Sequence, residues 1–145
     1  MKRLLTLFAL LVGLTTLAQL PPYVPTDGLV GYWGFHGNAN DESGNGNDGT
    51  VNGATLTEDR FGNSNSAYDF DGVDDFISCN SSDNGLDFYG VQELSINAWV
   101  LLENNGQQYG IVTNGVIDGV NPQYSFKVGN SGELYFISGT SSFEG

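Results

Sequence analysis

The feature that most constrains the fold is an alternation of apolar and polar residues across positions 66–79, interrupted by Asp71-Gly72. An Asp-Gly pair between two short runs of strand-forming residues is the strongest short-range signal of a β-hairpin. Because side chains alternate along a strand, Tyr68 and Phe70 share one face of the first arm. The stretch therefore predicts a hairpin with one face in the core and the other in solvent.

The remaining sequence favours the same class of structure. The chain has 145 residues, with 21 Gly and 12% aromatic residues, a composition typical of short strands joined by turns rather than of long helices. Residues 29–35 form a β-rich run, and in residues 94–101 the aliphatic side chains alternate with polar ones. Leu94, Ile96, Ala98 and Val100 are expected to face a core. The sequence predicts a single all-β domain.

The N-terminus carries the parts of a secretory signal peptide in their required order. Lys2 and Arg3 are followed by an apolar run and then by small residues before a cut ahead of Gln19. The apolar run is shorter than the roughly 20 residues that span a bilayer. We expect secretion to the extracellular space or the cell surface. The predicted segments are a signal peptide at 1–18, a proline-rich spacer at 19–27 and the folded domain at 28–145.

The charge of the chain excludes two classes of partner. The formal net charge is −13, from 17 acidic and 4 basic residues. Once the signal peptide is removed, Arg60 and Lys127 are the basic side chains that remain. Nucleic acids and anionic lipids attract proteins through Lys and Arg, so we expect neither nucleic-acid binding nor direct membrane binding. Arg60 itself is expected to pair with Glu58, Asp59 or a more distant acid, an ion pair that contributes little if exposed.

Three blocks of sequence, in order and suitably spaced, resemble the laminin-G-like, concanavalin A-like jelly-roll modules of secreted bacterial proteins. The blocks are residues 29–50, 66–79 and 94–100. The resemblance implies a two-sheet antiparallel jelly-roll sandwich, frequent calcium binding, and recognition of carbohydrate or cell surfaces. The Trp-His-His-Val-like strand and late acidic segment of the family have no counterpart here. We therefore expect a module that is incomplete at its C-terminus and belongs to a larger multidomain protein.

Calcium chemistry is expected in the loop at residues 37–49, which is rich in Gly, Asn and Asp. Calcium takes about six to eight oxygen ligands, and glycines let a backbone fold tightly around them. The loop is not an EF-hand, because Gly49 stands where the bidentate Glu is required. An ordinary solvated loop is the alternative, since the same residue types dominate turns. The predicted ligands are Asn38, Asp41, Asn45 and Asp48, and the competing set is Asp71, Asp74 and Asp75.

A second candidate site lies on the polar face of residues 94–101. The ring of Trp99 could stack against the polarised C–H groups of a sugar, with Asn97 on the same face. The alternative is a tryptophan covered by a loop or a neighbouring strand, because Trp is highly buried on average. With the resemblance, these residues predict a non-catalytic module that recognises a polysaccharide or surface glycan, with calcium as the candidate cofactor.

Two further functions stay open. A fragment or accessory domain of a glycoside hydrolase would use the same fold, and hydrolysis would need two carboxylates at a defined separation. The glucanases of this fold carry a Glu-x-Asp-x-x-Glu strand, whereas Asp69-Phe-Asp71 lacks both glutamates, so we expect no enzyme activity. The third reading is a structural or adhesive module of a larger surface protein.

Overall fold

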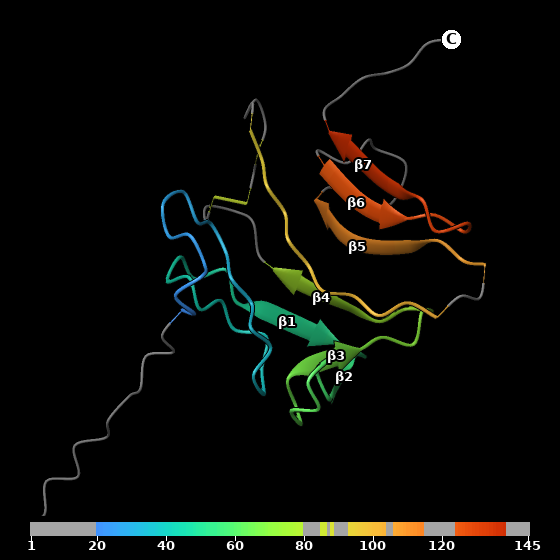
Figure 1. Ribbon diagram of the computed structural model, residues 1–145, viewed down its shortest axis with the longest axis horizontal. Coiled ribbons are helices and arrows are strands. Elements are labelled where there is room, and N and C mark those ends of the chain that lie inside the picture. Colours follow the sequence, from blue (N-terminus) through green and yellow to red (C-terminus); the bar gives the residue numbers. More distant parts are fainter. Residues whose placement is uncertain are drawn as a thin grey trace, which may run out of the picture.

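The computed structural model describes residues 20–79, 85–86, 88, 93–103, 106–114 and 124–138. The strands in this part of the chain are β1 (Gly49–Asn52), β2 (Thr55–Thr57), β3 (Ala67–Asp69), β4 (Phe76–Cys79), β5 (Tyr109–Asn114), β6 (Tyr124–Val128) and β7 (Leu134–Ser138). They pair antiparallel in three sheets, β1-β4, β2-β3 and β5-β6-β7 (Figure 1). The described residues contain no helix, which confirms the all-β class.

The expected signal peptide and any membrane-spanning segment bear on where the protein is located. The expected signal peptide, residues 1–18, lies outside the described residues. Within the described ranges, the structure has no helix of sufficient length and apolarity to cross a membrane.

The first two sheets are the two halves of one bent antiparallel ribbon. The β1-β4 pair ends with Asn52 opposite Phe76, and the β2-β3 pair continues with Thr55 opposite Asp69. The short connection between β1 and β2 therefore lies opposite the longer connection at residues 70–75 between β3 and β4. The extra length on one side forms a loop at the bend, and this loop carries a group of aspartates.

The predicted pairing of the two arms at residues 66–79 is wrong. The first arm, β3, pairs with β2, and the second arm, β4, pairs with β1. The turn chemistry is nevertheless used locally, because Gly72 has a φ of 75° and Val73 N donates to Asp71 Oδ1 at 2.8 Å. Each arm therefore pairs with a strand that precedes it in the chain. The hairpin that does form joins β2 to β3. At its loop end, Ser66 N donates to Thr57 O at 2.9 Å.

Residues 29–35, expected to form a strand, pair with no strand in the described part of the chain. Side chains from the following loop bind its backbone instead. Asn47 Nδ2 donates to Val30 O at 2.7 Å, and Tyr32 N donates to Asp41 Oδ1 at 3.0 Å. In this segment, side-chain amide and carboxylate groups make the hydrogen bonds that a neighbouring strand would otherwise make. The alternation of apolar and polar residues does not distinguish a strand paired in a sheet from a segment bound by side chains.

Packing is strongest around β6, the central strand of the three-stranded sheet. Tyr124 and Val128 are buried, and the Tyr124 ring lies edge-on to Phe88 with 5.2 Å between centroids. In the ribbon, the Tyr68 ring makes a similar contact with Phe35 at 5.3 Å. Phe70, expected on the same buried face as Tyr68, is 46% exposed. The β3 arm is therefore buried only in its first half.

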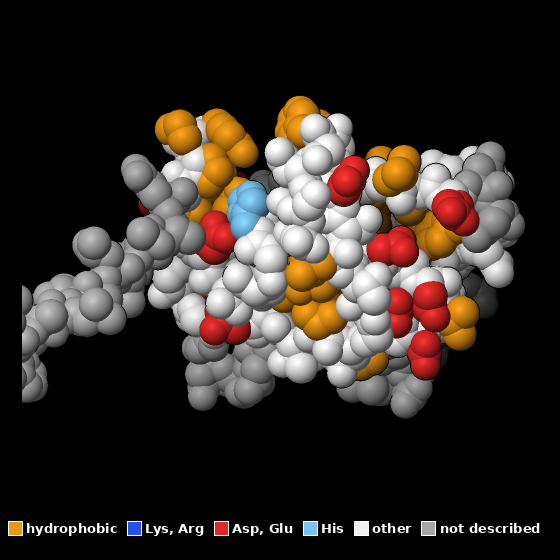
Figure 2. All heavy atoms as spheres, turned by 90° about the horizontal axis from the view of Figure 1, so that it is seen from below, with side chains coloured by type: hydrophobic (Ala, Val, Ile, Leu, Met, Phe, Trp, Pro, Cys, Tyr) orange, Lys and Arg blue, Asp and Glu red, His pale blue; other side chains and the backbone are white. Residues whose placement is uncertain are grey.

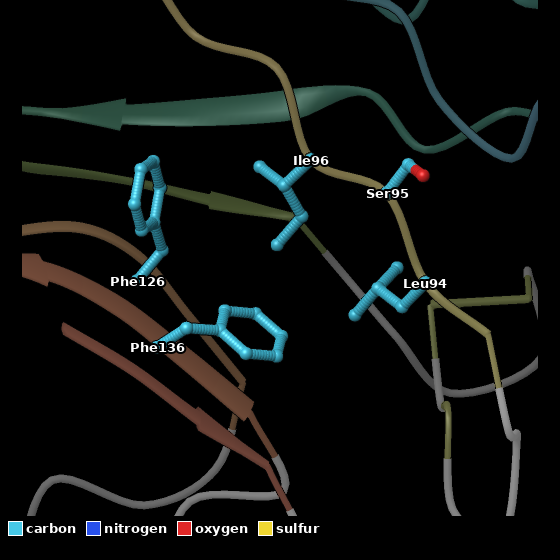
Figure 3. Close-up of a pocket in the computed structure, with 5 residues that line it drawn as sticks. All are labelled: Leu94, Ser95, Ile96, Phe126 and Phe136. Atoms are coloured by element: carbon cyan, nitrogen blue, oxygen red, sulfur yellow. The ribbon is translucent and has the colours of Figure 1, made fainter. Parts of the chain in front are cut away.

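The segment that begins at Leu94 faces the three-stranded sheet across a hollow of about 290 Å³. Figure 3 shows Leu94 and Ile96 on one side of this hollow and the cross-strand pair Phe126 and Phe136 on the other. The expected alternation holds at Leu94 and Ile96, which are half-buried, but Val100 is 50% exposed. Four of the five lining residues are apolar, and the fifth is Ser95.

Candidate functional site

Asp41, the central residue of the first predicted calcium set, binds the backbone of its own loop. Its Oδ1 accepts hydrogen bonds from Tyr32 N at 3.0 Å and Ser43 N at 2.9 Å. Its Oδ2 accepts one from Asn47 N at 3.0 Å. Both carboxylate oxygens are therefore engaged by amides, and the side chain closes the loop onto the preceding extended segment.

These contacts also set the acidity of Asp41. Burial raises the pKa of the carboxyl, but hydrogen bonds from the Ser43 side chain and from the amides of Tyr32, Asn47 and Ser43 outweigh it. The pKa is consequently held below its usual value, because hydrogen bonds to a carboxylate favour its charged form. Asp41 is an ionised structural group of the loop.

The other predicted ligands of this set have similar local roles. Asp48 Oδ1 accepts a hydrogen bond from Asp41 N at 2.8 Å, and Asn38 Oδ1 accepts one from Asn40 N at 2.8 Å. The amide of Asn45 donates to Leu29 O at 2.8 Å. The structure uses the polar groups of this set to shape the loop, and they fit a hydrogen-bonded turn better than a preformed calcium shell.

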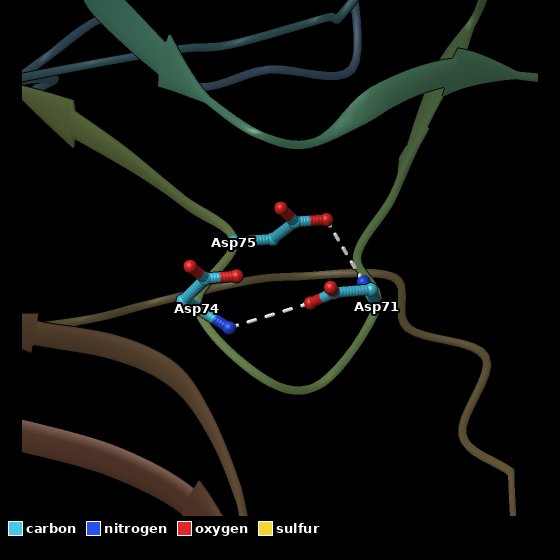
Figure 4. A group of neighbouring side chains, drawn as sticks. All are labelled: Asp71, Asp74 and Asp75. Carbon is cyan, nitrogen blue, oxygen red and sulfur yellow. Dashed lines mark hydrogen bonds between the residues drawn. The ribbon is translucent and has the colours of Figure 1, made fainter.

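The competing set, Asp71, Asp74 and Asp75, is drawn together at the bend of the ribbon (Figure 4). One oxygen from each carboxylate lies within 4.8 Å of the others. Calcium–oxygen distances of about 2.3–2.6 Å allow ligands on one ion to lie up to roughly 5 Å apart. The arrangement therefore fits a divalent cation, with water completing the rest of its shell.

Backbone contacts hold this aspartate group in place. Asp71 N donates to Asp75 Oδ2 at 2.9 Å, while Asp74 N makes a longer contact with Asp71 Oδ1 at 3.4 Å. Figure 4 shows both of these contacts. Asp71 and Asp74 are exposed and Asp75 is half-buried. Three like charges this close repel one another unless water or a cation offsets the repulsion.

The predicted carbohydrate-binding residues Trp99 and Asn97 are both exposed. The Trp99 side chain is 78% exposed, so in this structure it is not the covered tryptophan of the alternative reading. The Arg60 guanidinium carbon lies 3.5 Å from the centroid of the Trp99 ring and 4.5 Å from that of Phe61. Phe61 is itself 73% exposed. These three residues form what we call the Arg60 cluster: Arg60, Phe61 and Trp99.

The expected ion pair of Arg60 is absent from the described part of the chain. The one acid–base contact there joins His36 Nδ1 to Glu42 Oε1 at 3.6 Å, and it is an ion pair only when the imidazole is protonated. Asp59 is engaged elsewhere, because its Oδ1 accepts hydrogen bonds from Phe61 N at 2.8 Å and Asn63 N at 2.9 Å. Sequence reasoning missed this cluster. Arg60 and Trp99 lie far apart in the chain, and no local pattern predicts their contact.

Cys79 offers little as a nucleophile. It is a free, half-buried cysteine at the end of β4. Burial, together with the negative charges of Asp41 and Asp48, raises the pKa of its thiol. Since the thiolate is the reactive form, this environment keeps the sulfur unreactive at neutral pH.

No family model, curated protein or solved structure matches this chain. The chemistry of the surface therefore has to be inferred from its own residues. On the face drawn in Figure 2, acidic side chains are spread over the described surface and no Lys or Arg is visible. Against this acidic background, the Arg60 cluster and the aspartates at the bend are the two features with distinct binding chemistry.

Proposed function

We propose that this chain is a secreted, non-catalytic jelly-roll module that binds a polysaccharide or surface glycan as part of a larger surface protein. Calcium bound at Asp71, Asp74 and Asp75 would stabilise the folded domain. The observation that carries the proposal is the exposure of Trp99, at 78%. The all-β class and the resemblance to laminin-G-like modules are consistent with it.

The physical basis is the affinity of an open indole ring for the apolar face of a sugar. Leaving so large a ring in water costs free energy, because buried apolar area stabilises by about 25 cal/mol per Å². The electron-rich face of the ring attracts polarised C–H groups, as it attracts other positive edges. Asn97, also exposed, offers an amide that can both donate and accept hydrogen bonds with sugar hydroxyls.

We expect Trp99→Ala to abolish glycan binding while the melting temperature changes little, because exposed side chains usually contribute within about 0.5 kcal/mol. The measurement is a glycan array on the wild-type protein, followed by titration calorimetry of the best ligand with both proteins. Tyr23→Ala is the matched control, since Tyr23 is an aromatic residue that is 80% exposed outside the cluster.

Three results would contradict the proposal. Undiminished affinity in Trp99→Ala would remove the ring from the binding site. The absence of binding to any glycan would favour the adhesive or structural role. Release of reducing sugar from a bound polysaccharide would show a hydrolase instead.

A further inference from the structure

The Arg60 cluster combines an aromatic platform with a cation that forms no ion pair in the described part of the chain. Among the described residues, no carboxylate lies within ion-pair distance of Arg60, although the chain has 17 acidic residues. The guanidinium instead lies 3.5 Å from the Trp99 ring centroid. A guanidinium over a ring face keeps the N–H groups around its rim available, and these groups match carboxylate and sulfate oxygens in a bidentate manner.

Arg60 and Phe61 lie within a turn at residues 59–63, and the hydrogen bonds of this turn explain the position of Arg60. Asp59 N donates to Asn63 O at 3.1 Å, and Gly62 N donates to Asp59 O at 3.0 Å. The Asp59 carboxylate also accepts from Asn63 Nδ2 at 2.9 Å. The acid nearest to Arg60 in the chain is thus committed to closing the turn. The Asp59 carboxylate still lies close enough for its charge to interact with that of Arg60, but the guanidinium itself lies against the Trp99 ring and is exposed to solvent.

We infer that the Arg60 cluster is a subsite for a saccharide that carries a carboxylate or sulfate group. This inference rests on the proposed glycan-binding function and names its ligand class. Arg60 covers part of one face of Trp99, and the 78% exposure of the side chain leaves ring surface open to a sugar. The guanidinium would then pair with the acidic group of the same sugar or of its neighbour.

The negative charge of the rest of the protein restricts which acidic saccharides can bind. Arg60 and Lys127 are the basic residues in the described ranges, and the formal net charge of the chain is −13. Charges further away than the Debye length of about 8 Å are largely screened at physiological salt. A single spaced acidic group can therefore pair with Arg60, whereas a densely charged polymer would also meet the surrounding carboxylates. The expected ligand is a glycan with widely spaced acidic groups.

The test compares one sugar backbone with and without charge. A fully methyl-esterified oligogalacturonate, the same ester with one free carboxylate per chain, and an oligosaccharide with a single sulfate per chain are titrated into wild-type protein. We expect one of the two charged probes to bind at least about tenfold more tightly than the ester, the order of a charge-assisted hydrogen bond. Which probe prevails distinguishes a uronate ligand from a sulfated one. In Arg60→Gln this preference should fall to near unity, while Lys127→Gln keeps it.

The outcomes separate the inference from the function on which it rests. Charge preference that survives in Arg60→Gln, or equal binding of all three probes that depends on Trp99, overturns the inference and leaves glycan binding standing. If neither these probes nor any glycan on an array binds, both fail. Arg60→Lys, which keeps a cation but not the planar donor pair, should retain only part of the preference. A thermal melt of each variant shows that the fold is intact.

Discussion

At the scale of the residue, Asp41 is a group whose ionisation stabilises the fold. Its pKa is lower in the folded protein than its usual value, so its stabilising contribution is complete above that usual value, about 3.9. The contribution is lost as the pH falls through the lowered folded pKa. We expect Asp41→Asn to be less stable than wild type at neutral pH, with the difference shrinking in acid. Urea unfolding between about pH 2 and 7 measures this.

Asp27→Asn is the control for that experiment, because Asp27 is an exposed acid outside the loop. It should leave the pH profile of stability close to that of wild type. A stability difference between Asp41→Asn and wild type that stays constant down to the acid limit would show that shape, and not charge, is what Asp41 supplies.

At the scale of the element, Gly53 sets the bend between β1 and β2. It has a φ of 81°, and a Cβ at this position would clash with Asp75 Oδ1. Gly62 has a φ of 80° with open space around it. Gly62→Ala should therefore cost only the left-handed strain of about 1–2 kcal/mol. Gly53→Ala should cost more, because Asp75 must turn and lose its hydrogen bond to Asp71 N.

Paired thermal or urea unfolding of these two variants isolates the contribution of the bend. Equal losses of stability in Gly53→Ala and Gly62→Ala would mean that the Asp75 side chain moves without cost, and that the contact across the ribbon does not matter.

At the scale of the whole molecule, the formal net charge is −13, and we expect the stability of the fold to depend on divalent cations. A cation that binds only the folded state raises its stability, by about 1.4 kcal/mol at ten times the dissociation constant. We expect calcium to raise the melting temperature by a few degrees, chelator to reverse the rise, and Asp74→Asn to remove it. Differential scanning fluorimetry across millimolar calcium measures each effect.

Asp48→Asn should keep the calcium response, because Asp48 belongs to the hydrogen-bonded loop. The sequence favoured the Asp41 loop as the metal site; we propose Asp71, Asp74 and Asp75 instead, because one oxygen of each carboxylate lies within 4.8 Å of the others. A melt that is insensitive to calcium, or a response lost in Asp48→Asn but kept in Asp74→Asn, would contradict the assignment to the bend.

The local parts of the fold could be predicted from sequence because they depend on neighbouring residues. Alternating side chains and abundant turn residues indicated an all-β chain, and the turn at Asp71-Gly72 adopts the expected positive φ at its glycine. Trp99 and Asn97 are exposed, but so is Val100 on the opposite face of the alternating run, so alternation did not determine the exposure of Trp99. The group at Asp71, Asp74 and Asp75 was also visible, since its members lie within one turn.

The partners of each segment required the tertiary structure, because they depend on residues distant in the chain. The arms at residues 66–79 pair with β1 and β2 rather than with each other. Local turn signals do not predict which strands pair. Asp41 became a structural group only when residues 30–32 came beside its loop. Likewise, the contact of Arg60 with Trp99 joins two distant segments. Sequence alone determined the class of structure and the types of chemical group, whereas long-range packing decided which groups meet.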